Sequence, residues 1–349
     1  MEHFVLRLCE SQRKRGHDSS VVAITGGPLL EIAVQKGVPL TVLRGDHKVK
    51  RVAHAAAHFA RCRPDVIHCH NPTSLQYASV AKLASRGRLV FTDHAQTKGI
   101  VRVPGAFEWS LVDAFASVSA ETARHASDIG YHGHAEVVHN GVELTPARRS
   151  RAEVRAALGL DGRVVGVNVA SFFPVKAQDI LVRGTAELKK TGAPVTVLFV
   201  GDGGERPLVE KLAGDLGLDS VDLRFLGFRN DVADLLAASD FFVLPSRSEG
   251  FPMSILEAMS HRLPVVCTPV GGNPELVTDG EHGYLVPVDD VPALAAAMGK
   301  LVADEAHRRK LGQAGHARVE GDFSFERTTD RYDAMYGRAL AARRRWVLV

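Results

Sequence analysis

Short runs of aliphatic and β-branched residues alternate with longer amphipathic stretches along most of the chain. In the first part, strands are predicted at 20–24, 38–43, 65–68, 88–92, 115–119 and 135–139. After a polar break, further strands are predicted at 164–170, 195–200, 223–226, 241–245, 265–268 and 284–286. Strands that are apolar on both faces and separated by helices are typical of parallel sheets, here in two doubly wound α/β units.

The polar break at 141–150 predicts the boundary between two domains, 1–145 and 150–322. Ser150 and Glu153 have the spacing of a capping box, which predicts a helix from there to Leu158, ended by Gly159. From Asp304 onward the pattern is helical only, with a long last helix over 323–340.

The chain opens on a predicted helix in which Phe4, Val5, Leu8 and Cys9 share one face and Gly16 is the stop. A complete βαβ unit would begin with a strand and a Gly-rich turn before that helix. Neither is present in the sequence.

Composition narrows the class of protein. With 349 residues, 45% hydrophobic and 24% charged, the chain is an ordinary globular one and is not intrinsically disordered. No window approaches the roughly 18 consecutive apolar residues of a membrane span, and the first residues lack the order of a signal peptide. The four cysteines contain no CxxC pair, which argues against a disulfide framework or zinc ribbon. We expect a cytoplasmic protein.

Charge is distributed unevenly. The net charge of +3 does not indicate a nucleic-acid partner, but residues 1–150 carry 19 Lys/Arg against 13 Asp/Glu, a net of +6, and 12 of the 16 histidines. The remainder carries 24 against 27, a net of −3. This asymmetry predicts different partners for the two halves.

The segment 245–259 carries the most chemistry. A buried strand leads into Glu249-Gly250, and Pro252 lies where a helix is expected to start. The unpaired N–H groups of that first turn suit a diphosphate. Glu249 precedes the helix and Glu257 lies just beyond its second turn, so both can face one bound molecule. Spacing alone is equally compatible with a loop glutamate and a solubilising helix glutamate.

The wider context of these residues resembles the retaining nucleotide-sugar glycosyltransferases of glycosyltransferase family 4. Glu249 and Glu257 match its two glutamates, with Gly250-Phe251 after the first and Ala258-Met259 after the second. Other matching segments follow in the family's order and together cover essentially the whole chain: 138–142, 200–203, 225–232, 264–266 and 271–275.

The resemblance implies a GT-B fold, with two Rossmann-like domains facing a cleft and residues 323–349 crossing back to the first domain. The second domain would bind a nucleoside-diphosphate sugar, with Glu257 on the ribose, Glu249 on the sugar hydroxyls and Lys176 on the diphosphate. The other donor-binding residues would be Gly201, Arg229, Gly250, Phe251, Pro252, Met253, Ser254 and Ile255.

The chain departs from the family at one position near Lys176. The family's usual arginine falls on Ser171 or Phe173, and neither is basic. Arg247 or Arg229 would then have to supply the second cation.

His94 matches a family histidine near the transferred sugar and is assigned a catalytic role with Lys176 and Glu249. His70 and Asn71, at the end of a predicted strand, would line the acceptor side. His68 and His70 alternate along that strand and so point the same way, but a metal site lacks a third ligand at a telling spacing.

Two further patterns bear on cofactors. The segment 201–206 has only the first two glycines of a dinucleotide fingerprint, which argues against nicotinamide binding. No Asp-x-Asp is present, so we expect no metal, with lysine and a helix N-terminus neutralising the diphosphate.

A basic helix over 48–63 fits either a solvated face or a patch on anionic lipid, through Lys48, Lys50 and Arg51. The lipid alternative suits a lipid-linked acceptor and a protein on the inner face of the membrane. The basic tail at 343–346 would add to it or be a frayed end.

The sequence thus predicts a metal-independent retaining glycosyltransferase of polysaccharide or cell-envelope synthesis. Two alternatives stay open: a sugar-nucleotide epimerase of the same fold, and an inactive protein that only binds nucleotide-sugar. The second arises because Met1-Glu2 fall on the last places of the family's Gly-Gly-Met-Glu segment, so that the strand and glycine pair are expected upstream of Met1 or lost.

Overall fold

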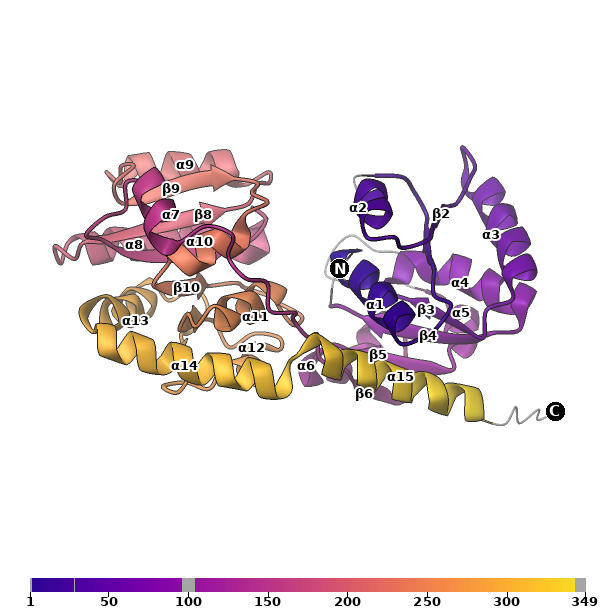
Figure 1. The fold of residues 1–349 in the computed structure, drawn as a ribbon. Coiled ribbons are helices and arrows are strands. Elements are labelled where there is room, and N and C mark those ends of the chain that lie inside the picture. Colours follow the sequence, from indigo (N-terminus) through magenta and orange to yellow (C-terminus); the bar gives the residue numbers. More distant parts are fainter. Residues whose placement is uncertain (1, 28, 96–103, 343–349) are drawn as a thin grey trace. The chain divides into compact units, whose positions relative to one another are not determined.

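The computed structural model describes residues 2–27, 29–95 and 104–342 (Figure 1). The chain divides into two compact units. Unit 1 consists of Met1–His139 and Glu326–Val349, and unit 2 of Asn140–Phe325. The first crossing between the units therefore lies just before the predicted break at 141–150, and the second lies at the start of the last helix.

The described part of unit 1 contains six strands in two parallel sheets. β1 pairs with β2, and the other four follow the order β3-β4-β5-β6. The strands are β1 (Val21–Ala23), β2 (Leu40–Val42), β3 (Val66–Cys69), β4 (Arg88–Asp93), β5 (Ala114–Ser117) and β6 (Ala135–Val137). The helices are α1 (Glu2–Lys14), α2 (Leu29–Gln35), α3 (Lys48–Cys62), α4 (Pro72–Ser85), α5 (Ala106–Ser110), α6 (Ala120–Arg124), a 3₁₀ turn at Ala126–Ile129, and α15 (Phe325–Ala341).

Unit 2 contains one six-stranded parallel sheet in the order β12-β11-β10-β7-β8-β9. The strands are β7 (Val164–Val169), β8 (Val195–Val200), β9 (Leu223–Gly227), β10 (Phe241–Leu244), β11 (Val265–Cys267) and β12 (Gly283–Leu285). The helices are α7 (Arg151–Ala157), a 3₁₀ turn at Pro174–Lys176, α8 (Gln178–Lys189), α9 (Arg206–Asp215), α10 (Val232–Ala238), α11 (Met253–Ser260), α12 (Asn273–Leu276), α13 (Val291–Ala303) and α14 (Glu305–Asp322).

Each predicted strand is present, with ends that differ by at most two residues. The capping box at Ser150 and Glu153 is confirmed, since each side chain bonds the other residue's backbone. The expectation of one doubly wound sheet per unit holds for unit 2. In unit 1 the described strands form two separate sheets instead, and the first described element is α1.

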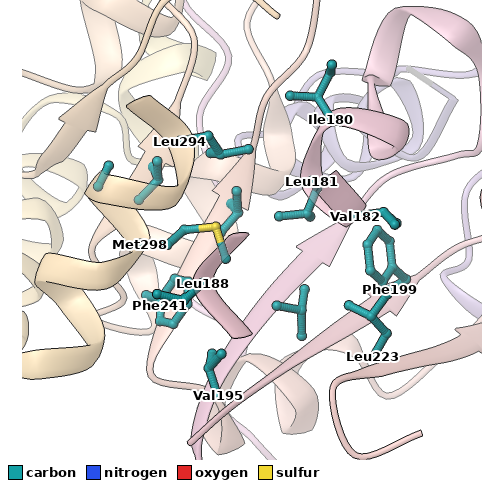
Figure 2. Close-up of a cluster of buried hydrophobic side chains, with 14 of the residues drawn as sticks. Ile180, Leu181, Val182, Leu188, Val195, Phe199, Leu223, Phe241, Leu294 and Met298 are labelled. Atoms are coloured by element: carbon teal, nitrogen blue, oxygen red, sulfur yellow. The ribbon is translucent and has the colours of Figure 1, made fainter. Parts of the chain in front are cut away.

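The core of unit 2 lies between its sheet and the helices α8 and α13 (Figure 2). Leu181 of α8 and Leu294 and Met298 of α13 are completely buried against the strand residues Phe199 and Phe241. The strands are apolar on both faces because helices cover both sides of the sheet, which leaves the loops at the strand ends to carry the chemistry. Among the described residues, no helix combines the length and the apolar character needed to cross a membrane.

Candidate active site

The order of strands in unit 2 changes direction between β7 and β10. The chain runs outward from β7 through β8 to β9, then returns to the other side of β7 with β10, β11 and β12. In open parallel sheets, ligands bind beyond the carboxyl ends of the strands at such a switch point. The loops that follow β7 and β10 carry Lys176 and Glu249.

Lys176 and Glu249 meet at this switch point. Lys176 Nζ donates to Glu249 Oε1 at 2.7 Å, and the hydroxyl of Ser246 donates to the same oxygen at 2.7 Å. The Glu249 side chain is 6% exposed and that of Lys176 is 25% exposed. The family resemblance assigns Lys176 to the diphosphate and Glu249 to the sugar, and the two side chains are in direct contact.

Both arginines proposed as the second cation have acidic partners. Arg247 forms a bidentate pair with Asp179 and also donates to Asp289 Oδ1 at 2.7 Å. Arg229 forms a bidentate pair with Asp231 at 2.7 and 2.6 Å. Each guanidinium is thus engaged by carboxylates, so neither arginine is placed as the second cation that the family resemblance leads us to expect.

The Gly201 turn follows β8, next to the loop that leads to Lys176. Gly201 has φ +136°, and a Cβ there would lie 2.1 Å from the carbonyl oxygen of Ala170. Only glycine fits this approach. Asp202 O accepts from Phe172 N at 3.0 Å, which fastens the turn to the loop after β7. This places the Gly201 turn, like Lys176, at the carboxyl edge of the sheet.

The segment from β10 through the Glu249 loop to α11 has the predicted order of strand, loop and helix. Pro252 is the N-cap of α11 and makes no side-chain cap hydrogen bond. Met253, Ser254 and Glu257 are half-buried, whereas Phe251, Pro252 and Ile255 are buried. The first turn of α11 thus begins beside the Glu249 loop, as an anion site at this helix end requires.

Two neighbouring segments hold this loop in place. The buried Asn140 donates from Nδ2 to Phe251 O at 3.0 Å. Gly272 N donates to Gly250 O at 2.7 Å, and a Cβ on Gly271 would lie 2.1 Å from Glu249 O, closer than any side chain tolerates. Asn140 belongs to the crossing segment, so this segment also supports the turn before α11.

In unit 1 the predicted histidines also come together. His70 and His94 follow the adjacent strands β3 and β4, and His70 Nδ1 lies 3.2 Å from His94 Nε2. The ring of His68 lies 3.9 Å from that of His70, measured between centroids, so the two share one face as predicted. Asn71 is the N-cap of α4, where its Oδ1 accepts from Ser74 N at 2.7 Å.

His70 is buried, His68 and His94 are half-buried, and these surroundings strongly favour neutral rings. Burial lowers the pKa of His70 to about 3, because a charged imidazolium would lose its hydration. Burial also lowers the pKa of His68 and His94 well below the ordinary value, and each is lowered further by the charge that His70 would carry. Within the described residues, no group of three His, Cys, Asp or Glu side chains could hold a metal ion.

Sequence reasoning missed the residues that support the candidate site. Ser246 lies three positions before Glu249, a spacing too common to stand out. His68 is bonded at 2.7 Å to both Thr92 Oγ1 and Tyr336 Oη, and its ring packs on that of Tyr332. The two tyrosines are four positions apart on α15 and so share a face. This spacing is the feature of the sequence that could have indicated their common role.

Comparison with known proteins decides the family. A profile described as Glycosyltransferase Family 4 matches residues 1–146, and one described as Glycosyl transferases group 1 matches residues 163–304. A GDP-mannose-dependent monoacylated alpha-(1-6)-phosphatidylinositol monomannoside mannosyltransferase of Corynebacterium glutamicum is 30% identical over 71% of this chain and 70% of its own length. The chain belongs to glycosyltransferase family 4.

Two further comparisons extend this family 4 assignment. The lipopolysaccharide core biosynthesis glycosyltransferase LpsE of Rhizobium meliloti is 35% identical over 60% of this chain and 60% of LpsE, so the match spans about three fifths of that relative. The crystal structure of HepE from Anabaena in complex with UDP-glucose has a TM-score of 0.86 at 22% identity, covering 97% of this chain and 95% of that one. This likeness confirms the predicted GT-B fold.

Proposed function

We propose that the protein transfers a sugar from a nucleoside-diphosphate sugar to a hydroxyl group of a glycan or lipid-linked acceptor. The anomeric configuration is retained and no metal ion takes part. The observation that carries the proposal is the contact of Lys176 with Glu249 at the switch point of the unit 2 sheet. A cation for phosphate and a carboxylate for sugar hydroxyls, side by side, match the two ends of such a donor.

The relatives support the same class of donor and acceptor. The Corynebacterium relative is named for GDP-mannose and a monoacylated phosphatidylinositol monomannoside, and the HepE structure contains UDP-glucose. LpsE is named for the lipopolysaccharide core. We therefore place this chain in cell-envelope or polysaccharide synthesis.

The reaction breaks the bond between the sugar C1 and the β-phosphate oxygen and forms a bond between C1 and the acceptor oxygen. Charge develops on the leaving diphosphate, where Lys176 and the N–H groups of Met253–Ile255 stabilise it. The acceptor proton passes to the departing phosphate on the same face of the sugar. Glu249 orients the sugar through its hydroxyls, and Glu257 binds the ribose.

The remaining assigned residues complete the two substrate sites. Gly201 lets the backbone approach the nucleotide, and Arg229 borders the base end of the donor site. Unit 1 binds the acceptor, with His94 and His70 as neutral hydrogen-bonding groups beside it. Asn71 contributes to the acceptor side while it caps α4.

Donor panels test this function directly. The protein is incubated with UDP- and GDP-sugars and candidate acceptors in EDTA, and the product's mass and anomeric configuration are determined. A retained glycosidic product that disappears in Glu249→Ala supports the proposal. Isomerised sugar from donor alone would identify an epimerase, and binding without turnover an inactive protein. Full activity of Glu249→Ala contradicts the residue assignment.

The location proposed for this activity is the cytoplasmic face of a membrane. Lys48 and Lys50 are exposed at the start of α3, where Lys50 pairs with Asp46, and Arg51 is half-buried. These cations would draw α3 toward anionic lipid, at about 1 kcal/mol each near the surface. Sedimentation with phosphatidylglycerol vesicles, compared with phosphatidylcholine vesicles, tests this by loss of binding in the double variant Lys48→Glu, Lys50→Glu.

A further inference from the structure

The hydroxyl group of Ser246 is buried and donates a hydrogen bond to Glu249. Ser246 follows β10, is completely buried, and donates from Oγ to Glu249 Oε1 at 2.7 Å. Its own carbonyl oxygen accepts from Thr268 Oγ1 at 2.5 Å, which fastens it to the end of β11. A hydroxyl on such a rigid support fixes the position of whatever it bonds.

The two oxygens of Glu249 have different surroundings. Oε1 accepts from both Lys176 Nζ and Ser246 Oγ. In the described part of the chain, Oε2 accepts no hydrogen bond from the protein, which leaves it for a ligand. When Lys176 turns to a phosphate, Ser246 is the group that still holds Oε1.

We propose that Ser246 is a positioning residue that fixes the Glu249 carboxylate for the sugar of the donor when Lys176 is engaged by the diphosphate. This inference rests on the proposed function, since it assigns Glu249 to the sugar. Without Ser246, Glu249 rotates freely once Lys176 leaves it. The sugar then loses an oriented acceptor, while the nucleoside diphosphate keeps all its contacts.

The test compares nucleotide-sugar with nucleotide. Calorimetry gives the Kd of UDP-glucose, UDP, GDP-mannose and GDP. The ratio of the Kd of each nucleotide to the Kd of its nucleotide-sugar measures the contribution of the sugar to binding. Because a hydrogen bond to a charged group is worth about ten- to hundredfold in an equilibrium constant, Ser246→Ala should lower this ratio about tenfold. Ser246→Thr keeps the hydroxyl and should restore it.

Ser239→Ala is the matched control. Ser239 is also buried in unit 2, and its hydroxyl donates to the Leu235 carbonyl at 2.7 Å, away from the loops of the site. Its removal should leave the ratio unchanged at a comparable loss of thermal stability. An unchanged ratio in Ser246→Ala, or an equal loss for sugar and nucleotide, overturns the inference.

Two remaining outcomes are also decisive. If Ser246→Ala does not fold, Ser246→Thr and Ser246→Val, which have the same shape and differ by the hydroxyl, decide: a higher ratio in Ser246→Thr supports the inference, and equal ratios with intact nucleotide binding overturn it. If the wild-type protein transfers sugar from no donor in the panel, the proposed function is overturned, and this inference with it. The wild-type result therefore separates the two failures.

Discussion

Lys176 and Glu249 lie 73 positions apart in the sequence, yet Lys176 Nζ donates to Glu249 Oε1 at 2.7 Å. The contact arises because the first strand of the unit 2 sheet, β7, lies beside the fourth, β10. Each partner is thus held by the other until a ligand replaces one of them. On the proposed function, a diphosphate that binds Lys176 would release Glu249 for the sugar, so the pair would link recognition of the two ends of the donor.

Arg247 holds the turn that carries Lys176. Its side chain donates to Pro174 O at 2.8 Å besides the pairs with Asp179 and Asp289. Arg247→Met leaves two carboxylates without their cation beside the Lys176 turn, so UDP affinity should fall about tenfold. Titration calorimetry measures the affinity.

Arg151→Met is the control for Arg247→Met. Arg151 also pairs with a carboxylate, Asp240, at 2.7 Å and donates to two backbone carbonyls, but Asp240 precedes β10 at the opposite edge of the sheet. Its loss should leave UDP affinity unchanged. Equal affinities for both variants would show that Arg247 has no influence on Lys176.

Asn140 supports the turn before α11 through its hydrogen bond to Phe251 O. Asn140→Ala leaves that carbonyl without its buried donor, which should cost about 1–3 kcal/mol of stability and weaken UDP binding several-fold. Asn168→Ala removes a similar bond, to Val243 O at 2.8 Å within the sheet, and should cost stability alone. Denaturant unfolding and calorimetry separate the effects; weakened binding in both variants would speak against a specific role.

The sequence predicted the strands well because the runs at 195–200 and 241–244 are buried and, apart from Thr196, apolar. It predicted that Glu249, His70 and His94 each follow a strand, because buried runs and ordered motifs mark where the strands end, but not that His70 and His94 lie in contact. It did not predict that Lys176 and Glu249 bond each other, since side-chain pairing depends on strand order and rotamers. For the same reason, the sequence does not reveal that Asp179 and Asp289 bind the guanidinium of Arg247, one of the two candidates for the second cation.

The histidine cluster makes stability depend on pH. The pKa of His70 falls from about 6.5 to about 3 on folding, so the unfolded chain binds more protons between these values. Stability is therefore complete above pH 6.5 and is lost as the pH falls, by up to about 1.4 kcal/mol per pH unit for each such histidine.

The measurement for this prediction is the unfolding free energy of wild type and His70→Asn between pH 7.5 and pH 4.5. His70→Asn should have a shallower decline, and His132→Asn, which alters an exposed histidine of the same unit, should follow wild type. Parallel curves for wild type and His70→Asn would mean that His70 is not buried in its neutral form.

Binding of a nucleoside diphosphate without its sugar tests the central claim most directly. Calorimetry with UDP and GDP is performed on wild type, Lys176→Met and Glu249→Gln. Since charge-assisted hydrogen bonds to phosphate are strong, Lys176→Met should weaken binding at least about tenfold. Glu249→Gln keeps an acceptor for Ser246 but frees Lys176 from its carboxylate, so binding should tighten while sugar transfer is lost. Wild-type affinity in Lys176→Met, or equal weakening in both variants, would contradict the account.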